Sequence, residues 1–373
     1  MTLRVALVLG TSTGGVGEHV RLLVAGLVER GLRPAVFGPA ATDEAFGFSG
    51  RGARFAAVEI GATPRPDRDL TTVLRLRRLL RGADVVHAHG LRAGLLAGLA
   101  LGPRSSGRTP YLVSWHNAVL GDGVRRLAYV PLEAAVARLA DVSLGASSDL
   151  VERARELGGV DVRLGPVAAP PLGAPVRGRA EVRADLGVGD RPLLLAVGRL
   201  APQKGYPLLL GAAGRWRQRA DRPLLAIAGD GPLRARLEHR VRDEGLDVRF
   251  LGHRGDVPEL MRAADAVVLP SVWEARSLVA QEALRAGVPL VATAVGGVPE
   301  LVGDAALLVP FGDEAAFAAA VGRVLDEDGL AATLVERGRA RARGWPDVAD
   351  TVDQVAAVYR ELAGRRPRRP QDR

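Results

Sequence analysis

Apolar runs that alternate with amphipathic stretches divide the chain into a long series of strand and helix patterns. The expected helices of the first half run from the glycine-rich loop at 10–17 to about residue 30, and over 69–81, 91–101, 123–140 and 148–157. The expected strands lie at 3–9, 35–37, 56–60, 85–87, 111–114, 142–145 and 162–164. Short apolar strands that are each followed by a helix favour a parallel sheet with helices on both faces.

A second series of the same kind begins after residues 166–178, whose sequence PVAAPPLGAPVRG predicts a linker. Helices then prevail from 294 to 362. The expected strands are 193–197, 224–228, 248–250, 266–269 and 289–293, and the expected helices are 205–219, 231–244, 256–263 and 277–286. The predicted fold class is therefore α/β, with two Rossmann-like domains facing a central cleft.

The linker sets the expected domain boundaries. We predict an N-terminal domain at 1–170 and a C-terminal domain at 171–363. A helix at about 347–362 belongs to the second range and has the option of packing back on the first domain. Residues 364–373, GRRPRRPQDR, are expected to form a disordered basic tail.

Composition narrows the class of protein. At 373 residues the chain is long enough for two domains, and without cysteine it has neither disulfides nor thiolate chemistry. The first residues read as a strand rather than as a secretion signal, and no apolar run reaches the roughly 18 residues that span a bilayer. We therefore expect a cytoplasmic protein.

The net charge of +9 is unevenly distributed. Residues 1–170 carry 21 arginines against 15 acidic residues, whereas residues 171–363 carry 25 basic against 26 acidic residues. The excess on the first half suits an anionic partner such as phospholipid headgroups, and a general arginine bias explains it equally well. A nucleic-acid-binding protein is a further alternative, disfavoured because aromatic residues, which would stack on bases, make up only 4% of the chain.

Residues 193–205, LLLAVGRLAPQKG, join an apolar strand to a helix and place two cations after the strand. Open α/β sheets bind their ligands at this carboxyl edge. Lys204 is the single lysine beside 50 arginines, so either this position needs a compact ammonium or the lysine is there by chance. Arg199 and Lys204 are therefore candidate partners of an anion.

Two glutamates, Glu274 and Glu282, are separated by seven residues around the start of a helix. Glu274 is expected in the loop after the strand at 266–269, Ser277 at the helix cap and Glu282 on the helix. Two carboxylates alone suggest glycoside hydrolysis, or are simply solvated acids, whereas two cations at the same sheet edge favour a diphosphate ligand. The helix N-terminus at Ser277 adds partial positive charge.

The loop GGVG at 14–17 lies between the first strand and the first helix. Glycines at this place allow backbone amides to approach a phosphate, and they also form tight turns. The spacing matches neither the dinucleotide motif nor the P-loop. Gly15 and Gly17 are therefore candidate ligand-binding residues, with a purely structural turn as the alternative.

Three histidines of the first half each follow a predicted strand. We expect His87 and His89 to be buried structural residues, and we leave His116 open between a structural role and a contact with the substrate. A metal site would need histidines or carboxylates that converge in space, which the sequence does not require. No metal and no cofactor are therefore expected.

Taken together, these motifs resemble the retaining glycosyltransferases of family 4, which have the GT-B architecture. The resemblance is strong over 193–312 and weaker over 1–117, and it is specific because many pieces occur in order. The matching pieces are GGVG at 14–17, GRLAPQKG at 198–205, AGDGPLRARLE at 228–238, FLGHRGDVPELMRAADAVVLPS at 250–271, the pair Glu274 and Glu282, AGVPLVAT at 286–293 and GGVPELV at 296–302.

This resemblance implies a nucleoside-diphosphate sugar as the donor, with the donor held by the C-terminal domain and the acceptor by the N-terminal domain. Arg199 and Lys204 would hold its diphosphate. Glu274 would contact the hydroxyls of the transferred sugar, and Glu282 would contact the ribose. The donor is a substrate, so the resemblance still implies no cofactor.

The resemblance also assigns residues around the donor. Gly15 and Gly17 would lie near the diphosphate and the acceptor, and His116 would contact the sugar. The nucleobase would lie beside the loop that includes Arg254 and Val257.

One segment departs from the family pattern. The family commonly has Glu-Gly-Phe-Gly where this chain has Glu274, Ala275, Arg276 and Ser277. Two glycines that let backbone amides approach the donor sugar are thus replaced by larger residues. The identity of the hexose therefore stays open, and Arg276 is a candidate for an additional contact.

The implied reaction moves a hexose to an acceptor hydroxyl with retention of the anomeric configuration. Arg199, Lys204 and helix amides would stabilise the leaving diphosphate without a metal ion, and the departing phosphate would accept the proton. In bacteria such enzymes serve envelope glycolipid, polysaccharide or small-glycoside synthesis. A nucleotide-sugar epimerase and a glycogen-type synthase of the same fold are the alternatives, and the base, the linkage, the acceptor and the oligomeric state stay open.

Residues 71–81, TTVLRLRRLLR, bear on where the acceptor is found. As a helix they form an apolar stripe rimmed by Arg75, Arg77, Arg78 and Arg81, which is typical of helices that lie on a membrane surface. The alternative is a helix packed on the first sheet with solvated arginines. The first reading would place the enzyme peripherally on the inner face of an anionic membrane, with a lipid-linked acceptor.

Overall fold

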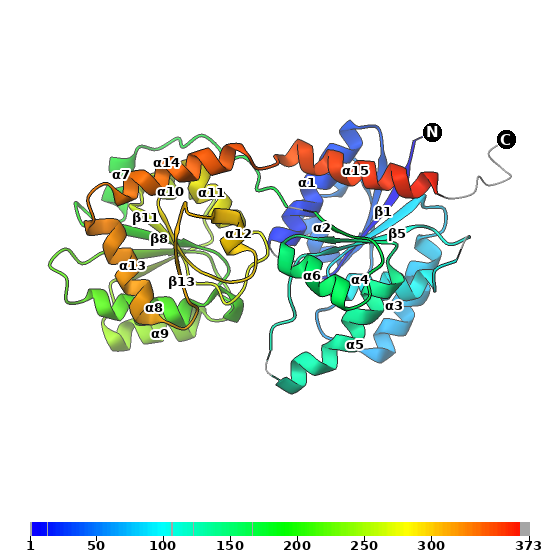
Figure 1. Cartoon of the computed structure of the whole chain (residues 1–373), viewed down its shortest axis with the longest axis horizontal. Helices are drawn as coiled ribbons and strands as arrows, with labels where there is room; N and C mark the ends of the chain where they lie inside the picture. Colours follow the sequence, from blue (N-terminus) through cyan, green and yellow to red (C-terminus); the bar gives the residue numbers. More distant parts are fainter. Residues whose placement is uncertain (1, 13, 106, 122, 166, 366–373) are drawn as a thin grey trace. The chain divides into compact units, whose positions relative to one another are not determined.

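The computed structural model describes the chain except for residues 1, 13, 106, 122, 166 and 366–373. It has two compact units, which we call unit 1 (Met1–Ala168 with Pro346–Arg373) and unit 2 (Ala169–Trp345) (Figure 1). Each unit is a Rossmann-like α/β domain with a parallel sheet between helices. The alternating pattern of the sequence predicts this architecture.

Unit 1 is built on a seven-stranded parallel sheet in the order β3-β2-β1-β4-β5-β6-β7. Its strands are β1 (Arg4–Leu9), β2 (Arg33–Gly38), β3 (Arg54–Ala57), β4 (Val85–His89), β5 (Tyr111–Trp115), β6 (Val142–Gly145) and β7 (Val162–Leu164). Its helices are α1 (Gly15–Glu29), α2 (Ala40–Phe46), the 3₁₀ turn η1 (Ser49–Arg51), α3 (Pro66–Leu79), α4 (Leu91–Leu101), α5 (Gly123–Leu139), α6 (Ser148–Glu156) and α15 (Val348–Gly364). The central strands β1, β4, β5 and β6 are almost wholly buried because helices cover both faces.

The last helix, α15, packs on α1 of unit 1 and shares its core. The close approach requires a glycine, since a Cβ atom on Gly26 would lie 2.7 Å from Val352. Arg30 and Asp353 join the two helices by an ion pair of 2.6 Å. The helix expected at about 347–362, for which packing on the first domain was one option, thus belongs to unit 1. Unit 2 begins at Ala169 and ends at Trp345.

Unit 2 is built on a six-stranded parallel sheet in the order β10-β9-β8-β11-β12-β13. Its strands are β8 (Leu193–Val197), β9 (Leu224–Ala228), β10 (Val248–Gly252), β11 (Ala266–Leu269), β12 (Leu290–Thr293) and β13 (Leu307–Val309). Its helices are α7 (Arg179–Asp185), η2 (Pro202–Lys204), α8 (Tyr206–Trp216), α9 (Arg234–Glu244), α10 (Val257–Ala263), α11 (Leu278–Ala286), α12 (Val298–Val302), α13 (Glu314–Asp326) and α14 (Leu330–Arg343). Leu193 and Leu195 face one core while Leu194 and Ala196 face the other, which explains the unbroken apolar run.

The structure corrects several expected elements. The helices α2 and α7 and the strand β13 were not predicted, because elements of three to seven residues contain too few apolar positions to show a period. The strand expected at 56–60 is β3 (Arg54–Ala57) instead. Val58 and Ile60 are buried in the loop that follows, so their apolar character reflects packing rather than strand pairing.

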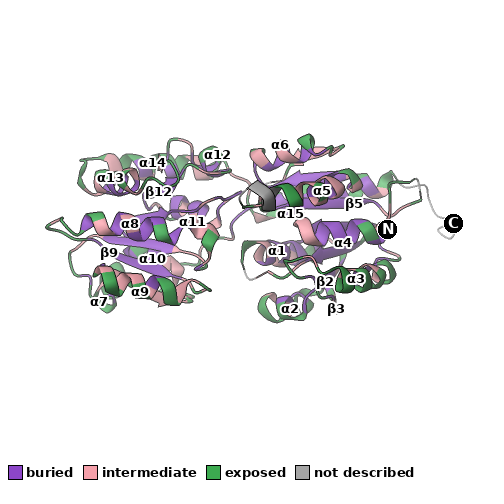
Figure 2. Ribbon diagram, turned by 90° about the horizontal axis from the view of Figure 1, so that it is seen from below, coloured by how far each residue is buried: buried purple, intermediate pink, exposed green. Residues whose placement is uncertain are grey.

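Burial follows the layers of each unit, with buried strands and helices that expose one face (Figure 2). In the described part of the chain, no helix combines the length and the apolar content that crossing a bilayer requires. The tail expected at 364–373 lies outside the described residues except for Gly364, which ends α15, and Arg365.

Candidate active site

Two neighbouring strands of unit 2, β8 and β11, lead into loops that pack directly on one another. The loop after β8 contains Gly205, where a Cβ atom would lie 1.9 Å from the carbonyl oxygen of Pro270. Val272 donates its backbone N–H to the carbonyl of Gln203 at 2.8 Å, and the Gln203 side chain donates to the carbonyl of Trp273 at 3.0 Å. The two loops therefore form one rigid edge of the sheet.

The expected cation and the expected acid meet at this edge. Lys204 Nζ lies 2.6 Å from Glu274 Oε1, and the Ser271 hydroxyl donates to the same oxygen at 2.7 Å. The Lys204 side chain is 24% exposed and that of Glu274 only 10%. Burial, assisted by the charge of Glu274, raises the pKa of the Tyr206 phenol beside them. Lys204 and Glu274 thus form a half-buried ion pair rather than two separate surface charges.

Arg199 stands apart from this pair on an exposed turn. The turn is fixed through the next residue, because Leu200 is buried and its backbone N–H donates to the carbonyl of Asp230 at 2.9 Å. The glycines of the facing loop allow this approach, since a Cβ atom on Gly231 would lie 2.6 Å from the carbonyl oxygen of Leu200. The backbone is therefore held in place while the guanidinium is left in solvent.

The helix α11 begins within the same edge. Ser277 is its N-cap, and its hydroxyl accepts a hydrogen bond from the backbone N–H of Ala280 at 3.3 Å. This confirms the helix cap that the sequence predicts at Ser277. Glu282 lies on α11 and is half-buried. The partial positive charge of the helix N-terminus and the cation of Lys204 thus belong to the same loop cluster.

Arg276, the residue that departs from the family pattern, lies against Trp345. Its guanidinium carbon is 5.7 Å from the centre of the Trp345 ring, and that of Arg285 is 5.9 Å from the same ring. Burial lowers the pKa of Arg276 to about 10, with Glu300 opposing the shift and Arg285 adding to it. Nε and Nη2 of Arg276 are buried and have no hydrogen-bond partner among the described residues. Trp345, rather than the Lys204–Glu274 pair, is the contact that the structure gives this side chain.

The loop expected beside the nucleobase is held by its own ion pair. Arg254 donates its Nε–H to Asp256 at 2.6 Å, and the pair keeps the pKa of Asp256 below its usual range. Val257 is the first residue of α10 and is half-buried. This loop follows β10, which lies at the edge of the sheet, two strands from β8.

The glycine-rich loop of unit 1 owes part of its sequence to packing. A Cβ atom on Gly17 would lie 2.2 Å from the Phe46 ring of α2, so a larger residue would require that ring to move. The Gly17 amide donates to the Ser12 hydroxyl at 3.0 Å. Gly15 is the first residue of α1. Packing against Phe46 thus gives a structural reason for glycine at position 17. The sequence alone allows either this reason or a role in ligand binding.

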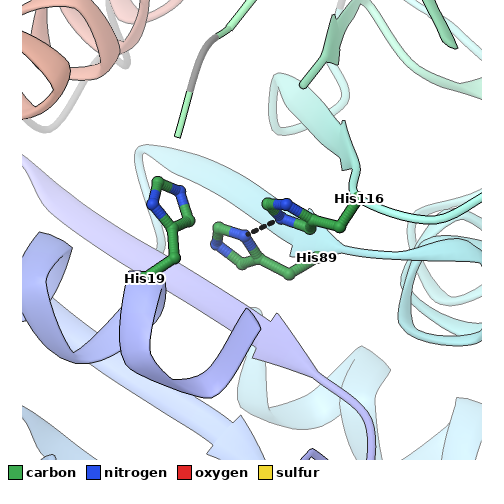
Figure 3. Close-up of side chains that lie close together, drawn as sticks. All are labelled: His19, His89 and His116. Atoms are coloured by element: carbon green, nitrogen blue, oxygen red, sulfur yellow. Dashed lines mark hydrogen bonds between the residues drawn. The ribbon is translucent and has the colours of Figure 1, made fainter. Parts of the chain in front are cut away.

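Three buried histidines gather at the carboxyl edge of the unit 1 sheet (Figure 3). His89 ends β4, His116 follows β5, and His19 lies near the start of α1. His89 Nδ1 and His116 Nε2 are 3.1 Å apart, and the His19 ring packs edge-on against both others. Burial lowers the pKa of His19 to about 4 and, together with His19, that of His116 to about 3. All three imidazoles are therefore neutral at pH 7.

His87 and His89, both expected from the sequence to be buried structural residues, differ in their hydrogen bonding. His87 is fully satisfied, with Nδ1 at 2.6 Å from the Tyr359 hydroxyl of α15 and Nε2 at 2.8 Å from Ser114 Oγ. His89 is not, because its Nε2 is buried without a partner among the described residues. His19 is not among the residues that the motifs predict for a site, and its only signal in the sequence is its place in the first helix directly after the glycine-rich loop.

Comparison with known families and proteins gives a consistent result. The family described as Glycosyl transferases group 1 matches residues 178–341, and the Glycosyl transferase 4-like domain matches residues 14–173. The chain is 34% identical to the 2-deoxystreptamine N-acetyl-D-glucosaminyltransferase of Streptomyces fradiae over 327 residues, which cover 79% of this chain and 75% of that protein. It is 35% identical to the alpha-D-kanosaminyltransferase of Streptomyces kanamyceticus over 191 residues, which are 49% of each chain.

Solved structures share the fold. Alr3699/HepE of Anabaena, crystallised in complex with UDP, aligns with a TM-score of 0.79 at 19% identity and covers 96% of this chain and 100% of its own. The sucrose-phosphate synthase of Thermosynechococcus elongatus aligns with a TM-score of 0.77 at 22% identity over 97% and 99% of the two chains. At these identities the likeness concerns the GT-B fold alone.

Proposed function

Since the chain belongs to the group 1 glycosyltransferases, we propose that it transfers a hexose from a nucleoside-diphosphate sugar to an acceptor hydroxyl with retention of configuration. The observation that carries the proposal is the Lys204–Glu274 pair, which lies beside the N-terminus of α11. This arrangement offers a cation, a carboxylate and oriented backbone dipoles within one rigid loop cluster. A diphosphate with an attached sugar needs all three.

Lys204 and Arg199 are assigned to the diphosphate. An ammonium has three N–H donors, of which Glu274 accepts one, so two stay available for phosphate oxygens. Arg199 is exposed on a fixed turn and adds a second cation. As the glycosidic bond breaks, negative charge develops on the leaving diphosphate, and preorganised cations stabilise it. The reaction proposed here therefore draws on side chains and helix amides rather than on a metal ion.

Glu274 is assigned to the transferred sugar and Glu282 to the ribose. The Glu274 carboxylate is held by Ser271 and Lys204 through one oxygen, Oε1, which leaves Oε2 to accept a bond from a sugar hydroxyl. Glu282 lies farther along α11. Arg254 and Val257 are assigned to the edge of the nucleobase. Gly15 and Gly17 of unit 1 are assigned to the diphosphate and the acceptor, and His116 to the sugar.

Uridine diphosphate sugars are the first donors to test, because the Anabaena protein of the same fold was crystallised with UDP. Two relatives are named for 2-deoxystreptamine, which supports a small polyhydroxylated acceptor. The decisive experiment incubates the enzyme with a panel of nucleotide sugars and such acceptors, and measures nucleotide release and the anomeric configuration of the product by NMR. A product with inverted configuration would contradict this proposal. Epimerisation of the donor in the absence of an acceptor would instead indicate a nucleotide-sugar epimerase.

A lipid-linked acceptor is the second candidate, and the surface of α3 favours it. Leu76 is fully buried against unit 1, but Leu70 and Leu74 are 63% and 50% exposed among the solvated arginines of the same helix. Part of the expected apolar stripe is thus used for packing, and part stays on the surface. Each basic residue contributes roughly 1 kcal/mol of attraction to an anionic membrane.

Co-sedimentation with anionic liposomes tests this candidate. Binding should rise with the fraction of anionic lipid, fall with salt, and weaken when Arg75, Arg77, Arg78 and Arg81 are replaced by Gln. Arg236→Gln, an exposed arginine of unit 2, is the matched control. Absence of binding at low salt would leave the soluble acceptor as the proposal.

A further inference from the structure

The histidine cluster of unit 1 brings together nitrogen ligands from three separate elements. One ring nitrogen of each of His19, His89 and His116 lies within 4.8 Å of the corresponding nitrogens of the other two. All three side chains are buried, at 5%, 3% and 8% relative exposure. Figure 3 shows the imidazoles turned toward a common centre from α1 and from the ends of two strands.

The separation of the nitrogens fits a metal ion. Zinc binds imidazole nitrogen at about 2.0–2.1 Å, so two such ligands in a tetrahedron lie about 3.3–3.4 Å apart. His89 Nδ1 and His116 Nε2 are already 3.1 Å apart. The His19 ring packs edge-on against the other two, and one of its nitrogens lies within 4.8 Å of theirs, so a shared ion requires the His19 ring to move closer.

Neighbouring side chains hold the cluster in place, and His89 Nδ1 and His116 Nε2 are hydrogen-bonded to each other in the absence of an ion. His87 packs on His89 with ring centres 4.0 Å apart and is itself fixed by Tyr359 and Ser114. His89 Nε2, in contrast, is buried with no partner in the described part of the chain. Buried polar atoms are normally hydrogen-bonded, so the His89 ring is not locked by partners on both of its nitrogens, as the His87 ring is.

We propose that His19, His89 and His116 form a binding site for a borderline transition-metal ion, with Zn²⁺ as the type, and with the fourth position open. The ligands are neutral nitrogens without a carboxylate, a set that suits Zn²⁺, Cu²⁺ or Co²⁺ and discriminates against Mg²⁺ and Ca²⁺. The site belongs to unit 1 and shares no residue with the Lys204–Glu274 pair of unit 2.

An inhibitory effect of the ion follows if the proposed function holds. His116 is assigned there to the sugar, and a His116 nitrogen bound to Zn²⁺ no longer bonds to a sugar hydroxyl. Zn²⁺ should therefore inhibit transfer reversibly, and EDTA should restore it. Binding of the ion itself does not depend on the proposed function.

The test uses the full chain without an affinity tag and with Co²⁺ as the probe. One Co²⁺ per chain should bind and give the intense visible absorption of a four-coordinate ion, and ZnCl₂ should displace it while MgCl₂ does not. His19→Gln and His116→Asn should each weaken binding at least about 10-fold, since even the loss of a group that only orients a ligand costs about 10–100-fold. His239→Gln, which removes an exposed histidine paired with Asp243, is the matched control and should bind as wild type.

X-ray absorption of the zinc-loaded wild-type protein removes any dependence on variants that fail to fold. It should show three imidazole nitrogens at about 2.0–2.1 Å. Failure of Co²⁺ and Zn²⁺ to survive equilibrium dialysis, or fewer than three imidazole ligands, overturns the metal site. Because absorption needs no substrate, this failure is distinguishable from failure of the proposed transferase activity.

Discussion

Unit 1 and unit 2 share one architecture but have opposite kinds of candidate site at the carboxyl edge of the sheet. In unit 2 the site is charged, with Lys204 and Glu274 paired across the loops that follow two adjacent strands. In unit 1 it is neutral and buried, with histidines from α1, β4 and the residue after β5. The same edge of a parallel sheet can thus hold an ion pair, as in unit 2, or a buried group of neutral imidazoles, as in unit 1. The side chains at the ends of the strands and in the loops that follow decide which of the two forms.

Lowering the pH should destabilise unit 1 more than unit 2, and this is the largest effect that we expect. A histidine that is neutral in the folded protein takes up a proton on unfolding below pH 6.5. The unfolded state therefore binds more protons, and the free energy of unfolding decreases as the pH is lowered. The loss extends from about pH 6.5 down to about 4 for His19 and about 3 for His116, and it reaches about 3 kcal/mol for His19 alone. Besides each other, these rings face His87 and His89, which burial also keeps neutral.

Urea unfolding with EDTA present, followed by hydrogen exchange of peptides from each unit, measures this loss. Unit 1 should weaken between pH 6.5 and 4 and unit 2 should change little. His19→Gln should flatten the profile of unit 1, whereas His239→Gln should not. Equal pH dependence of the two units would show that the buried histidines do not set the acid stability.

Removal of the cations of unit 2 should affect catalysis next most strongly. Arg199→Ala and Lys204→Ala should each lower kcat at least about 100-fold, the usual effect of deleting one preorganised donor. The two variants should differ in the stability of the folded protein. Arg199 is exposed and its loss should leave the melting temperature unchanged, whereas the loss of Lys204 leaves Glu274 buried without its cation and costs about 1–3 kcal/mol.

Steady-state kinetics and thermal unfolding measure both effects, with Arg236→Ala as the exposed control in the same unit. Turnover close to that of wild type in both variants would remove the diphosphate assignment. Equal stability of the two variants would mean that the Lys204–Glu274 pair contributes nothing to folding.

The two glutamates of unit 2 should divide their effects between kcat and KM. Glu274→Gln keeps a group that accepts from Ser271 but loses the charge beside the reacting sugar, so kcat should fall. Glu282→Ala removes the contact proposed for the donor ribose, which is equal in the ground and transition states, so KM for the donor should rise. Each effect should be about 10-fold, the equivalent of one charged hydrogen bond. Unchanged donor kinetics in both would return these residues to a structural role.

Chelation should have the smallest effect. If Arg199, Lys204 and the N-terminus of α11 neutralise the leaving diphosphate, turnover should survive dialysis against EDTA. Enzyme that carries Zn²⁺ at the histidine cluster should gain activity on the same treatment. Complete loss of turnover that Mg²⁺ or Mn²⁺ restores would contradict the assignment of the diphosphate to side chains.

The sequence by itself determined the architecture and the family. Short apolar strands separated by helices predict two parallel sheets, because only strands covered on both faces are continuously apolar. The resemblance to family 4 glycosyltransferases is confirmed by the relatives and by the two family matches. The candidate residues of unit 2 were accessible to sequence reasoning since they lie in loops that directly follow strands, and consecutive loops of a parallel sheet share one edge.

Only the tertiary structure decided which side chains meet. His19 and His116 are 97 residues apart, and His87 is fixed by Tyr359 from the far end of the chain. Gly17 is explained by the Phe46 ring, and Arg276 lies on Trp345, which no periodicity predicts. These contacts depend on how helices are placed against the sheet, which is a property of packing between distant segments. The pattern of apolar and polar residues along a helix or strand indicates which of its faces is buried. It does not indicate which other segment packs against that face.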